Sequence, residues 1–308
     1  MDEEYESEFE DAETGALRAF TRGPLAGAAE AEPRTVGELV RALSAMYPER
    51  DAEEWDRTGL LVGDASEPLS GVAVALDPTV AGVREAAEAG ANVLITHHPA
   101  FLDAPSFFGP ATRRPEDGGA VVYEAVKRGV ALANWHTALD VSAAAQEMLP
   151  GMLRLSRVGV LEPLAHDDGR GYGQVCSAEA DGAEQGSGLT LGRLAARCTA
   201  TFHRAPRVWG DMDKPVRTAV TWTGAAGDAM QRCLERGVDV LICGEAKYHA
   251  ALAAANAGLS IIELGHDVSE EPFAKVLAAS AARAGVPHGK IAFVDVRERW
   301  AYPETRRV

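Results

Sequence analysis

The segment GVAVALDPTVAGVREAAEAGANVLITHHP at residues 71–99 decides the fold class. It opens with a short β-branched run at 71–77 that is typical of a strand. Residues 79–90 have a helical pattern closed by a glycine, and the run that begins at residue 91 returns to a strand pattern. A strand, a helix and a second strand in this order predict a βαβ unit with parallel strands and a right-handed crossover.

The same alternation of strands and helices continues on both sides of this segment. Thr35 and Glu38 form a capping-box signature at the start of an amphipathic helix. A stretch at 165–190 is rich in Gly, Asp and Glu, and it marks the expected boundary between two lobes. We therefore predict an α/β fold with mixed, largely parallel sheets and with lobes at 34–165 and 190–308.

The two predicted lobes resemble each other in sequence. In the first, AVALD is followed by a helix ending in EAG and then by NVLITHH. In the second, AVTWTG is followed by a helix ending in ERG and then by DVLICGE. An internal duplication explains this order, but any two βαβ units share much of it. The sequence leaves both interpretations open.

Negative charge is concentrated at the start of the chain. The net charge over 308 residues is -16, and about half of it comes from residues 1–33, which carry ten Asp or Glu against Arg18 and Arg22. This segment has few large apolar side chains, so we expect a disordered acidic tail. The remaining chain has no basic stripe that would neutralise phosphates, which argues against a nucleic-acid partner.

The cysteines and the apolar runs indicate a cytoplasmic protein. Cys176, Cys198, Cys233 and Cys243 include no CxxC pair, so reduced thiols are expected and a zinc ribbon is excluded. No apolar run approaches the roughly 20 residues that span a bilayer, and the acidic start does not resemble a signal peptide. We expect no membrane association.

Histidines and carboxylates gather at the predicted ends of three strands. They are His97 and His98 after VLIT, His136 and Asp140 after ALANW, and His266 and Glu270 after SIIELG. The carboxyl ends of parallel strands border a crevice in which loops present side chains to a ligand. Pro99 ends the strand, so His97 and His98 can serve one site. His266 and Glu270 are four residues apart and can reach the same side of a strand-to-helix turn.

This donor set predicts a pair of divalent metal ions. Three imidazoles and two carboxylates are nitrogen and oxygen donors suited to zinc, iron, manganese or nickel. Five ligands exceed what one catalytic ion with an open position takes, whereas a bridging carboxylate lets the set hold two ions. The predicted ligands are His97, His98, Asp140, His266 and Glu270, and zinc and iron are the first expectations for the metal.

Six motifs follow one another along the chain: WDRTGLLVGD (55–64), ALDPTV (75–80), AGANVLITHHPAF (89–101), HTALD (136–140), CGEAKYH (243–249) and GHDVSE (265–270). Together they resemble the Nif-three-like family, a dinuclear metal-binding family whose members are often named GTP cyclohydrolase 1 type 2 homologues. The resemblance covers about residues 35–300. It implies that the same five residues ligate a dinuclear centre, with one carboxylate bridging the ions.

The resemblance also implies a wider architecture. Members of the family have two related α/β lobes with the metal site between them, and they form a toroidal homohexamer whose sites face an internal cavity. The inserted domain that some members carry between the lobes is not expected in a chain of this length. Two segments depart from the family pattern: GYGQ places Gln174 where a basic residue is common, and VSAAAQEML follows HTALD. Both departures bear on substrate recognition, because a lost Arg weakens binding of a phosphate.

Residues beside the expected ligands have two interpretations each. His136 is the candidate for acid/base catalysis, as a non-ligating histidine that moves protons, or else a structural histidine of its loop. Glu245, Lys247 and His249 either line the cavity or are ordinary polar residues at the start of a helix. The glycine-rich TGAAGDA at 223–229 is interpreted as a tight turn, because it lacks the Lys-Ser/Thr of a phosphate-binding loop.

The expected function is a divalent-metal-dependent hydrolase acting on a small molecule, with nucleotides among the candidate substrates. Two ions lower the pKa of a bound water and polarise the bond under attack. Cyclohydrolase action on a guanine nucleotide and phosphoester hydrolysis both suit such a site. The alternative is a non-catalytic metal-binding scaffold, metallochaperone or regulatory protein, which the acidic tail would suit.

Overall fold

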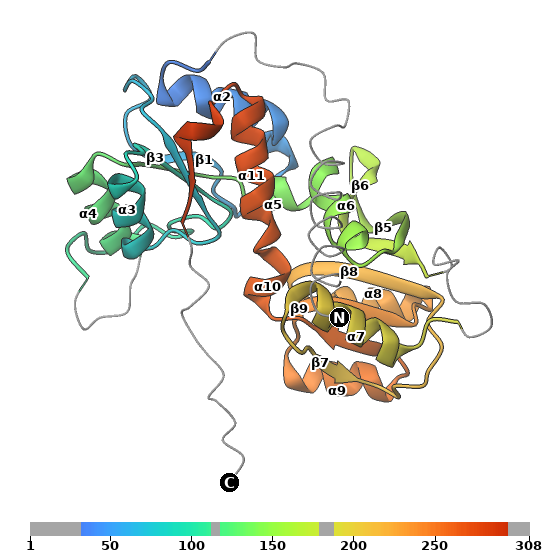
Figure 1. Ribbon diagram of the computed structural model, residues 1–308. Coiled ribbons are helices and arrows are strands. Elements are labelled where there is room, and N and C mark those ends of the chain that lie inside the picture. The colour runs from blue at the N-terminus through green and yellow to red at the C-terminus, as the bar shows by residue number, and fades with distance from the viewer. Residues whose placement is uncertain (1–31, 112–117, 179–187, 295–308) are drawn as a thin grey trace, which may run out of the picture. The chain divides into compact units, whose positions relative to one another are not determined.

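The computed structural model describes residues 32–111, 118–178 and 188–294 (Figure 1). Residues 1–31, most of the expected acidic tail, lie outside the described residues. Among the helices that the structure describes, none combines the length and the apolar character needed to cross a membrane. The described chain divides into two compact units, and the chain passes from one to the other within two helices, α5 and α11.

The first unit comprises residues 32–138 and 277–294 and is built on a five-stranded sheet. The strand order is β1-β4-β3-β2-β11, with β1 antiparallel to β4 and the other neighbours parallel. Its elements are α2 (Val36–Met46), η1 (Glu49–Asp51), β1 (Gly59–Val62), β2 (Val72–Ala75), α3 (Val80–Glu88), β3 (Val93–Thr96), α4 (Gly118–Arg128), β4 (Ala131–Asn134), the start of α5 (Thr137–Asp140), most of α11 (Pro272–Arg283), η2 (His288–Lys290) and β11 (Ile291–Phe293).

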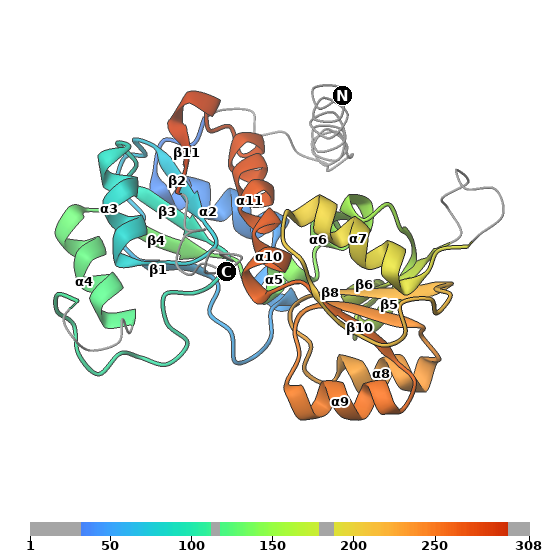
Figure 2. The same cartoon turned by 60° about the horizontal axis from the view of Figure 1, so that its bottom comes forward.

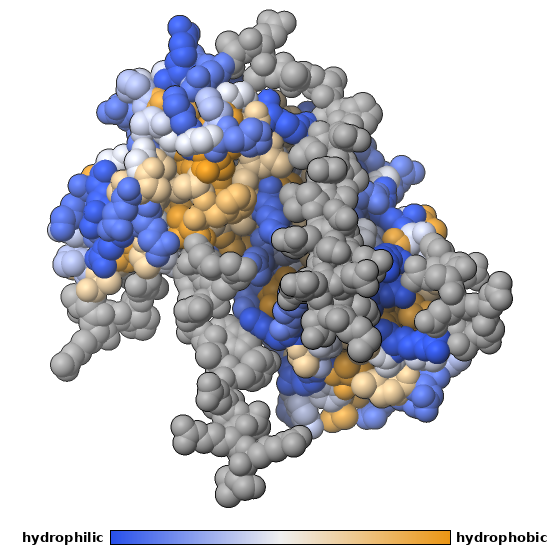
Figure 3. Space-filling view, viewed as in Figure 1, coloured by the Kyte–Doolittle hydropathy of each residue, from blue (hydrophilic) through white to orange (hydrophobic). Residues whose placement is uncertain are grey.

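Helices cover both faces of this sheet, which explains why its strands have continuous apolar sequences rather than alternating ones. α3 and α4 lie on one face, while α2 and α11 lie on the other (Figure 2). Leu94 and Leu132 pack against α3 and α4 in one buried cluster, and Val93 and Ile95 on the opposite face are also fully buried. The outer surfaces of α3 and α4 are mostly hydrophilic (Figure 3).

The second unit comprises residues 139–276 and is built on a six-stranded mixed sheet. The strand order is β5-β6-β8-β9-β10-β7, in which β8, β9 and β10 are parallel and the outer strands are antiparallel. Its elements are α6 (Ala143–Met152), β5 (Ser156–Leu164), β6 (Asp167–Ser177), α7 (Leu191–Phe202), β7 (Arg207–Trp209), β8 (Thr218–Ala225), α8 (Ala229–Arg236), β9 (Val240–Glu245), α9 (Tyr248–Asn256), β10 (Ser260–Glu263) and α10 (His266–Glu270).

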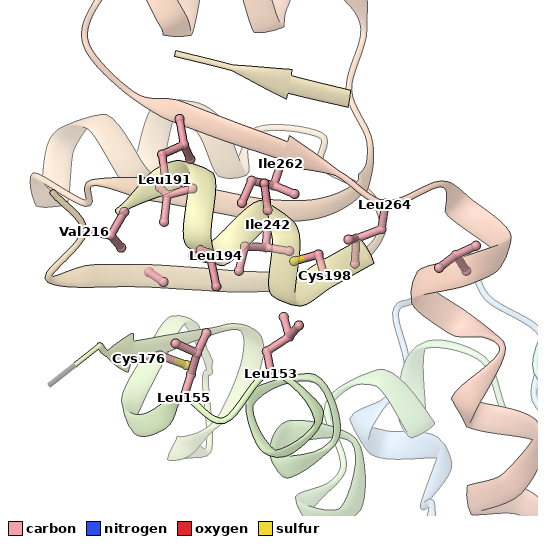
Figure 4. Close-up of a cluster of buried hydrophobic side chains, with 14 residues drawn as sticks. Leu153, Leu155, Cys176, Leu191, Leu194, Cys198, Val216, Ile242, Ile262 and Leu264 are labelled. Carbon is pink, nitrogen blue, oxygen red and sulfur yellow. The ribbon is translucent and has the colours of Figure 1, made fainter. Parts of the chain in front are cut away.

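Two hydrophobic clusters fill the two faces of the second sheet. Because successive strand residues point to opposite faces, Ile242 enters one cluster and its neighbour Leu241 enters the other. The cluster with Ile242 also contains Leu194 of α7 and is drawn in Figure 4. The cluster with Leu241 contains Met230 of α8 and residues of α9. α6 and α7 therefore cover one face, and α8 and α9 cover the other (Figure 2).

These sheets confirm the predicted fold class, an α/β chain with two mixed, largely parallel sheets. The division into compact units differs from the lobes expected at 34–165 and 190–308. The physical reason is a pair of long-range strand pairings. The hairpin β5–β6 pairs with β8, and the late strand β11 returns to pair with β2. Neither pairing has a local signal in the sequence, because the partners are far apart in the chain.

The two units repeat one topology. The order α2-β1-β2-α3-β3-α4-β4 in the first unit has its counterpart in α7-β7-β8-α8-β9-α9-β10 in the second. The sheet orders β1-β4-β3-β2 and β7-β10-β9-β8 correspond strand by strand, with the first strand of each series antiparallel to its neighbour. This correspondence supports an internal duplication, because two unrelated βαβ units have no reason to share an antiparallel edge strand as well.

Each repeat also begins in the same way. Thr35 caps α2 and Thr190 caps α7, and each hydroxyl accepts a backbone N–H three residues on. The two threonines form isolated bridges with Pro68 and Pro215 respectively. Those prolines end the similar segments GDASEP and GDMDKP, in which the Asp side chain accepts the backbone N–H two residues later. The helix entry of both repeats is thus held by the same set of contacts.

Candidate metal centre

Three histidines of the first unit meet beside the ends of two parallel strands. His97 and His98 follow β3, and His136 follows β4. One ring nitrogen of each lies within 4.8 Å of the others. The ring centroids are 4.9 Å apart for His97 and His98, 5.1 Å for His97 and His136, and 5.5 Å for His98 and His136. β3 ends at Thr96 as expected, so the two adjacent histidines share a site.

Each of the three rings has its Nδ1 next to an acceptor that cannot donate. The acceptors are the carbonyl of Trp135 for His97 (3.3 Å), the carboxylate of Asp77 for His98 (2.7 Å) and the carboxylate of Asp56 for His136 (3.1 Å). Nδ1 must therefore carry the hydrogen in all three rings, and Nε2 carries the lone pair of the neutral form. Metal-binding histidines in proteins show this arrangement, in which an acceptor fixes the tautomer and the ring orientation.

Asp56 is held as a carboxylate in a fully buried position. Burial raises its pKa, but hydrogen bonds from His136 and from both the hydroxyl and the backbone N–H of Thr137 outweigh that effect. The pKa of Asp56 consequently lies below its ordinary value. An ionised Asp56 at neutral pH keeps the Nδ1 hydrogen on His136 and fixes the plane of the ring.

The second unit contributes an imidazole and a carboxylate from one short helix. His266 and Glu270 begin and end α10, which follows β10 through Gly265 at a φ of 108°. The Nε2 of His266 lies 3.1 Å from Oε2 of Glu270, and its Nδ1 lies 3.1 Å from Oε1 of Glu245. Glu270 is buried. The four-residue spacing thus brings the pair together as predicted, and Glu245 at the end of β9 orients the ring.

A glycine makes room for the Glu270 carboxylate. Gly224 lies in β8 with a φ of +61°, and a Cβ at this position would stand 2.3 Å from Oε1 of Glu270 and 3.4 Å from Cε1 of His266. Its backbone N–H donates to the hydroxyl of Ser269 at 2.9 Å. The segment TGAAGDA is therefore more than a turn, because its first glycine, Gly224, packs directly against the carboxylate of Glu270.

Asp140 lies at the end of α5 and accepts a hydrogen bond from the hydroxyl of Thr223 at 3.2 Å. Both residues line a small hollow of the second unit that also includes Gln174 and Trp222. Gln174, at the position where the resemblance led us to expect a basic residue, is buried, and its Oε1 accepts from the hydroxyl of Thr221. Position 174 thus supplies a neutral amide, and not a cation, to the hollow beside Asp140.

The cysteine thiols are poor candidates for metal ligands. Cys176, Cys198, Cys233 and Cys243 are buried and form no disulfide. Burial raises the pKa of the first three to about 12 and that of Cys243 still higher. Because a thiol must lose its proton to bind a metal, imidazoles and carboxylates are the suitable donors.

Of the other residues that the sequence suggested, one contacts a ligand candidate and two are exposed. Glu245 contacts His266, whereas Lys247 and His249 are exposed at the start of α9, where His249 packs edge-on against Tyr248. The sequence did not reveal Asp77 as a partner of His98. Its position two residues after β2 was the available signal, because a carboxylate near a strand end can reach the end of the neighbouring strand.

Comparison with known proteins identifies the family of this chain. A family model described as Duf34/NIF3 (NGG1p interacting factor 3) matches residues 34–298. A protein of Streptomyces coelicolor named GTP cyclohydrolase 1 type 2 homolog is 32% identical over 281 residues, which cover 89% of this chain and 94% of the relative. This chain belongs to the Duf34/NIF3 family. The resemblance inferred from the six motifs is thereby confirmed.

Other relatives extend the likeness of this Duf34/NIF3 protein. A Clostridium acetobutylicum protein of the same name is 26% identical over 246 residues, covering 79% of this chain and 88% of the relative. The crystal structure of Staphylococcus aureus hypothetical protein SA1388 matches with a TM-score of 0.75 and 21% identity, over 88% of this chain and all of that chain. The crystal structure of TTHA1606 from Thermus thermophilus matches with a TM-score of 0.62 and 25% identity, over 84% and 96%. These structures share the fold of this Duf34/NIF3 chain.

Proposed function

We propose that this chain is a divalent-metal-dependent hydrolase whose dinuclear centre is ligated by His97, His98, Asp140, His266 and Glu270. One observation carries the proposal. The Nδ1 of each of the three imidazoles lies at hydrogen-bond distance from an acceptor of Trp135, Asp77 or Glu245, and Nε2 of His266 faces the proposed ligand Glu270. Rings held in this way present Nε2 for coordination, so the residues fit a metal on their own geometry.

The donor chemistry fits the same conclusion. Neutral imidazoles and carboxylates suit zinc or iron first, and manganese or nickel next. Ions bound there would act as Lewis acids that make a water molecule more acidic and polarise the bond it attacks. The carboxylates of Asp77 and Glu245 would hold the rings of His98 and His266 in place, and the hydroxyl of Thr223 would fix Asp140.

The substrate is proposed to be a small molecule, with guanine nucleotides and phosphoesters as the two candidates. The name of the Streptomyces coelicolor relative supports the cyclohydrolase reaction. Gln174 bears on the choice, because an uncharged amide beside Asp140 would bind a phosphate more weakly than an arginine would. The role of His136 in moving a proton stays a prediction, as do a cytoplasmic location and a homohexamer.

The test begins with the metal content of the purified full-length protein, followed by assays with GTP, cyclic nucleotides and phosphoesters. Asp140→Ala and Glu270→Ala should each lower both bound metal and turnover, whereas His249→Ala, an exposed histidine, should change neither. Unchanged turnover in the two ligand variants would refute the hydrolase mechanism. Metal that is bound and readily released, with no turnover on any substrate, would favour the metal-binding scaffold or metallochaperone instead.

Assembly is tested separately by light scattering after size exclusion. A mass six times that of the 32.5 kDa chain is expected. A monomer at micromolar concentration would refute the homohexamer without affecting the metal proposal.

A further inference from the structure

A small hollow of the second unit contains a hydrogen-bond donor that the proposed metal centre does not use. The hollow is lined mainly by residues of β6 and β8 and is large enough for about one water-sized group. Gln174 of β6 lines it and is only 6% exposed. We propose that Nε2 of Gln174 binds the carbonyl oxygen of an uncharged ring amide, such as that of a guanine base, and that the hollow does not accept a phosphate.

The pairing of β6 with β8 determines which end of the Gln174 amide is free. Gln174 and Thr221 are register partners, so their side chains lie side by side. The hydroxyl of Thr221, which is fully buried and does not line the hollow, donates to Oε1 of Gln174 at 3.2 Å. No described residue accepts a hydrogen bond from Nε2. A buried N–H without an acceptor is unfavourable, and a ligand oxygen in the hollow would satisfy it.

Neighbouring donors in the hollow already have acceptors. The hydroxyl of Thr223 donates to Asp140 at 3.2 Å, and Nε1 of Trp222 donates to the carbonyl of Ala225 at 3.0 Å. The amide of Gln174 is therefore a donor that remains available to a ligand. A donor with no acceptor in a nearly buried place selects for an acceptor group, because a second donor in the same place would leave both unsatisfied.

Aromatic side chains give the hollow an apolar wall. The rings of Tyr172 and Trp222 are stacked, with centroids 5.9 Å apart and planes inclined by 29°. Gly173 permits this arrangement, because a Cβ at that position would stand 2.8 Å from Cε3 of Trp222. Phe273 of α11 also lines the hollow. A planar ring can pack against such a wall while its carbonyl oxygen reaches the amide.

Charge distinguishes a carbonyl from a phosphate in this hollow. Among the described residues that line it, Asp140 alone is charged, and its charge is negative. A phosphate would be repelled by that carboxylate and would find no cation among the lining residues, whereas a neutral carbonyl needs only the amide hydrogen. The inference deepens the proposed function and rests on it for the reaction at Asp140. Of the two proposed substrate classes, it selects the guanine nucleotides and assigns the base to the hollow.

The experiment measures ligand binding to the metal-loaded full-length protein and does not depend on turnover. Guanosine and adenosine are the probes, because guanine carries a carbonyl oxygen where adenine carries an amino group. We expect guanosine to bind at least about 10-fold more tightly than adenosine and Gln174→Leu to abolish that preference. Gln231→Leu, at an exposed glutamine of α8, should keep it. Equal affinities for the two nucleosides, or an unchanged preference in Gln174→Leu, would overturn the proposal.

A second variant keeps the test available if Gln174→Leu does not fold. Gln174→Glu retains an oxygen for the Thr221 hydroxyl but lacks the N–H donor, so it should lose the preference for guanosine as well. Inorganic phosphate should bind equally to the unsubstituted chain and to Gln174→Leu, and more tightly to Gln174→Arg. Phosphate binding that falls in Gln174→Leu would overturn the proposal. Metal retained in Asp140→Ala would instead count against the proposed function and leave the nucleoside preference to decide this inference.

Discussion

Replacing Gly224 with alanine tests whether Glu270 occupies a functional position. The added Cβ would stand 2.3 Å from Oε1 of Glu270, and real Cβ atoms essentially never approach a heavy atom within 3.0 Å. The carboxylate must therefore move by at least about 0.7 Å. Metal–ligand distances tolerate about 0.2 Å, so the displaced oxygen can no longer ligate an ion held by its other ligands.

This substitution should lower both folding stability and metal affinity, and the two losses can be measured separately. The left-handed φ of +61° costs an alanine about 1–2 kcal/mol of folding stability, since its Cβ crowds the backbone. Displacing Glu270 should weaken metal binding by at least the 10- to 100-fold seen when partners of metal ligands are removed. Thermal unfolding of the metal-free protein reports the first effect, and competition with a chelator reports the second.

Gly227→Ala is the matched control. Gly227 has a φ of +49°, but a Cβ there would meet nothing within 4 Å. It should lose a similar amount of stability and keep its metal affinity. Equal metal affinities in Gly224→Ala and Gly227→Ala would refute the argument that Glu270 is a ligand held in place by this glycine.

Substitutions at three further positions test other parts of the structure. Glu245→Ala removes the acceptor at Nδ1 of His266 and should weaken metal binding about 10- to 100-fold, with Glu245→Gln milder; identical chelator competition would contradict this. Hydrogen bonds from Arg84 and Arg128 lower the pKa of Glu124 from 4.5 to about 2. The ionised carboxylate therefore stabilises the folded protein above about pH 4.5, and this contribution is lost as the pH falls towards 2. Glu124→Gln should therefore cost about 1–2 kcal/mol at pH 7 and nearly nothing at pH 2 in urea unfolding. Leu194→Ala should lose about 2–5 kcal/mol in the same assay, because its side chain is fully buried in the cluster of Figure 4; a loss below 1 kcal/mol would contradict that packing.

Local patterns predicted the elements that present the site, and the structure confirms them. The apolar run before His97 forms β3, and Pro99 follows a strand that ends at Thr96. The first half of the capping box is present, with the Thr35 hydroxyl accepting the Glu38 backbone N–H at 3.2 Å, while the Glu38 carboxylate accepts the backbone N–H of Arg34. These features depend on residues within four positions of one another, which is why the sequence alone was enough.

The partners that orient the histidines were harder to predict, because they come from other strands. Asp77 lies 21 positions before His98, and Asp56 lies 80 positions before His136. Nothing nearby in the sequence linked Asp56 to a histidine. The repeated segments GDASEP and GDMDKP, by contrast, were visible and would have strengthened the case for duplication.

The duplication explains why the two halves of the chain supply different donors from equivalent places. In the register of the paired strands, His98 lies two residues after Thr96 and Glu245 lies two residues after Cys243, at the ends of β3 and β9. One repeat thus has the imidazole where the other has its carboxylate partner. Two residues after the corresponding pairs Ala75–Thr96 and Trp222–Cys243, the chain has Asp77 beyond β2 and Gly224 in β8, where the register shifts before Ala225 pairs with Glu245.

This exchange has a steric cause. In the first unit Asp77 fills the position and bonds to His98, whereas in the second unit a side chain at Gly224 would displace the carboxylate of Glu270. The acceptor beside Nδ1 of His266 is Glu245, which comes from β9. The two repeats therefore pair a histidine after one strand with a carboxylate from the neighbouring strand: His98 after β3 with Asp77 after β2, and His266 after β10 with Glu245 of β9.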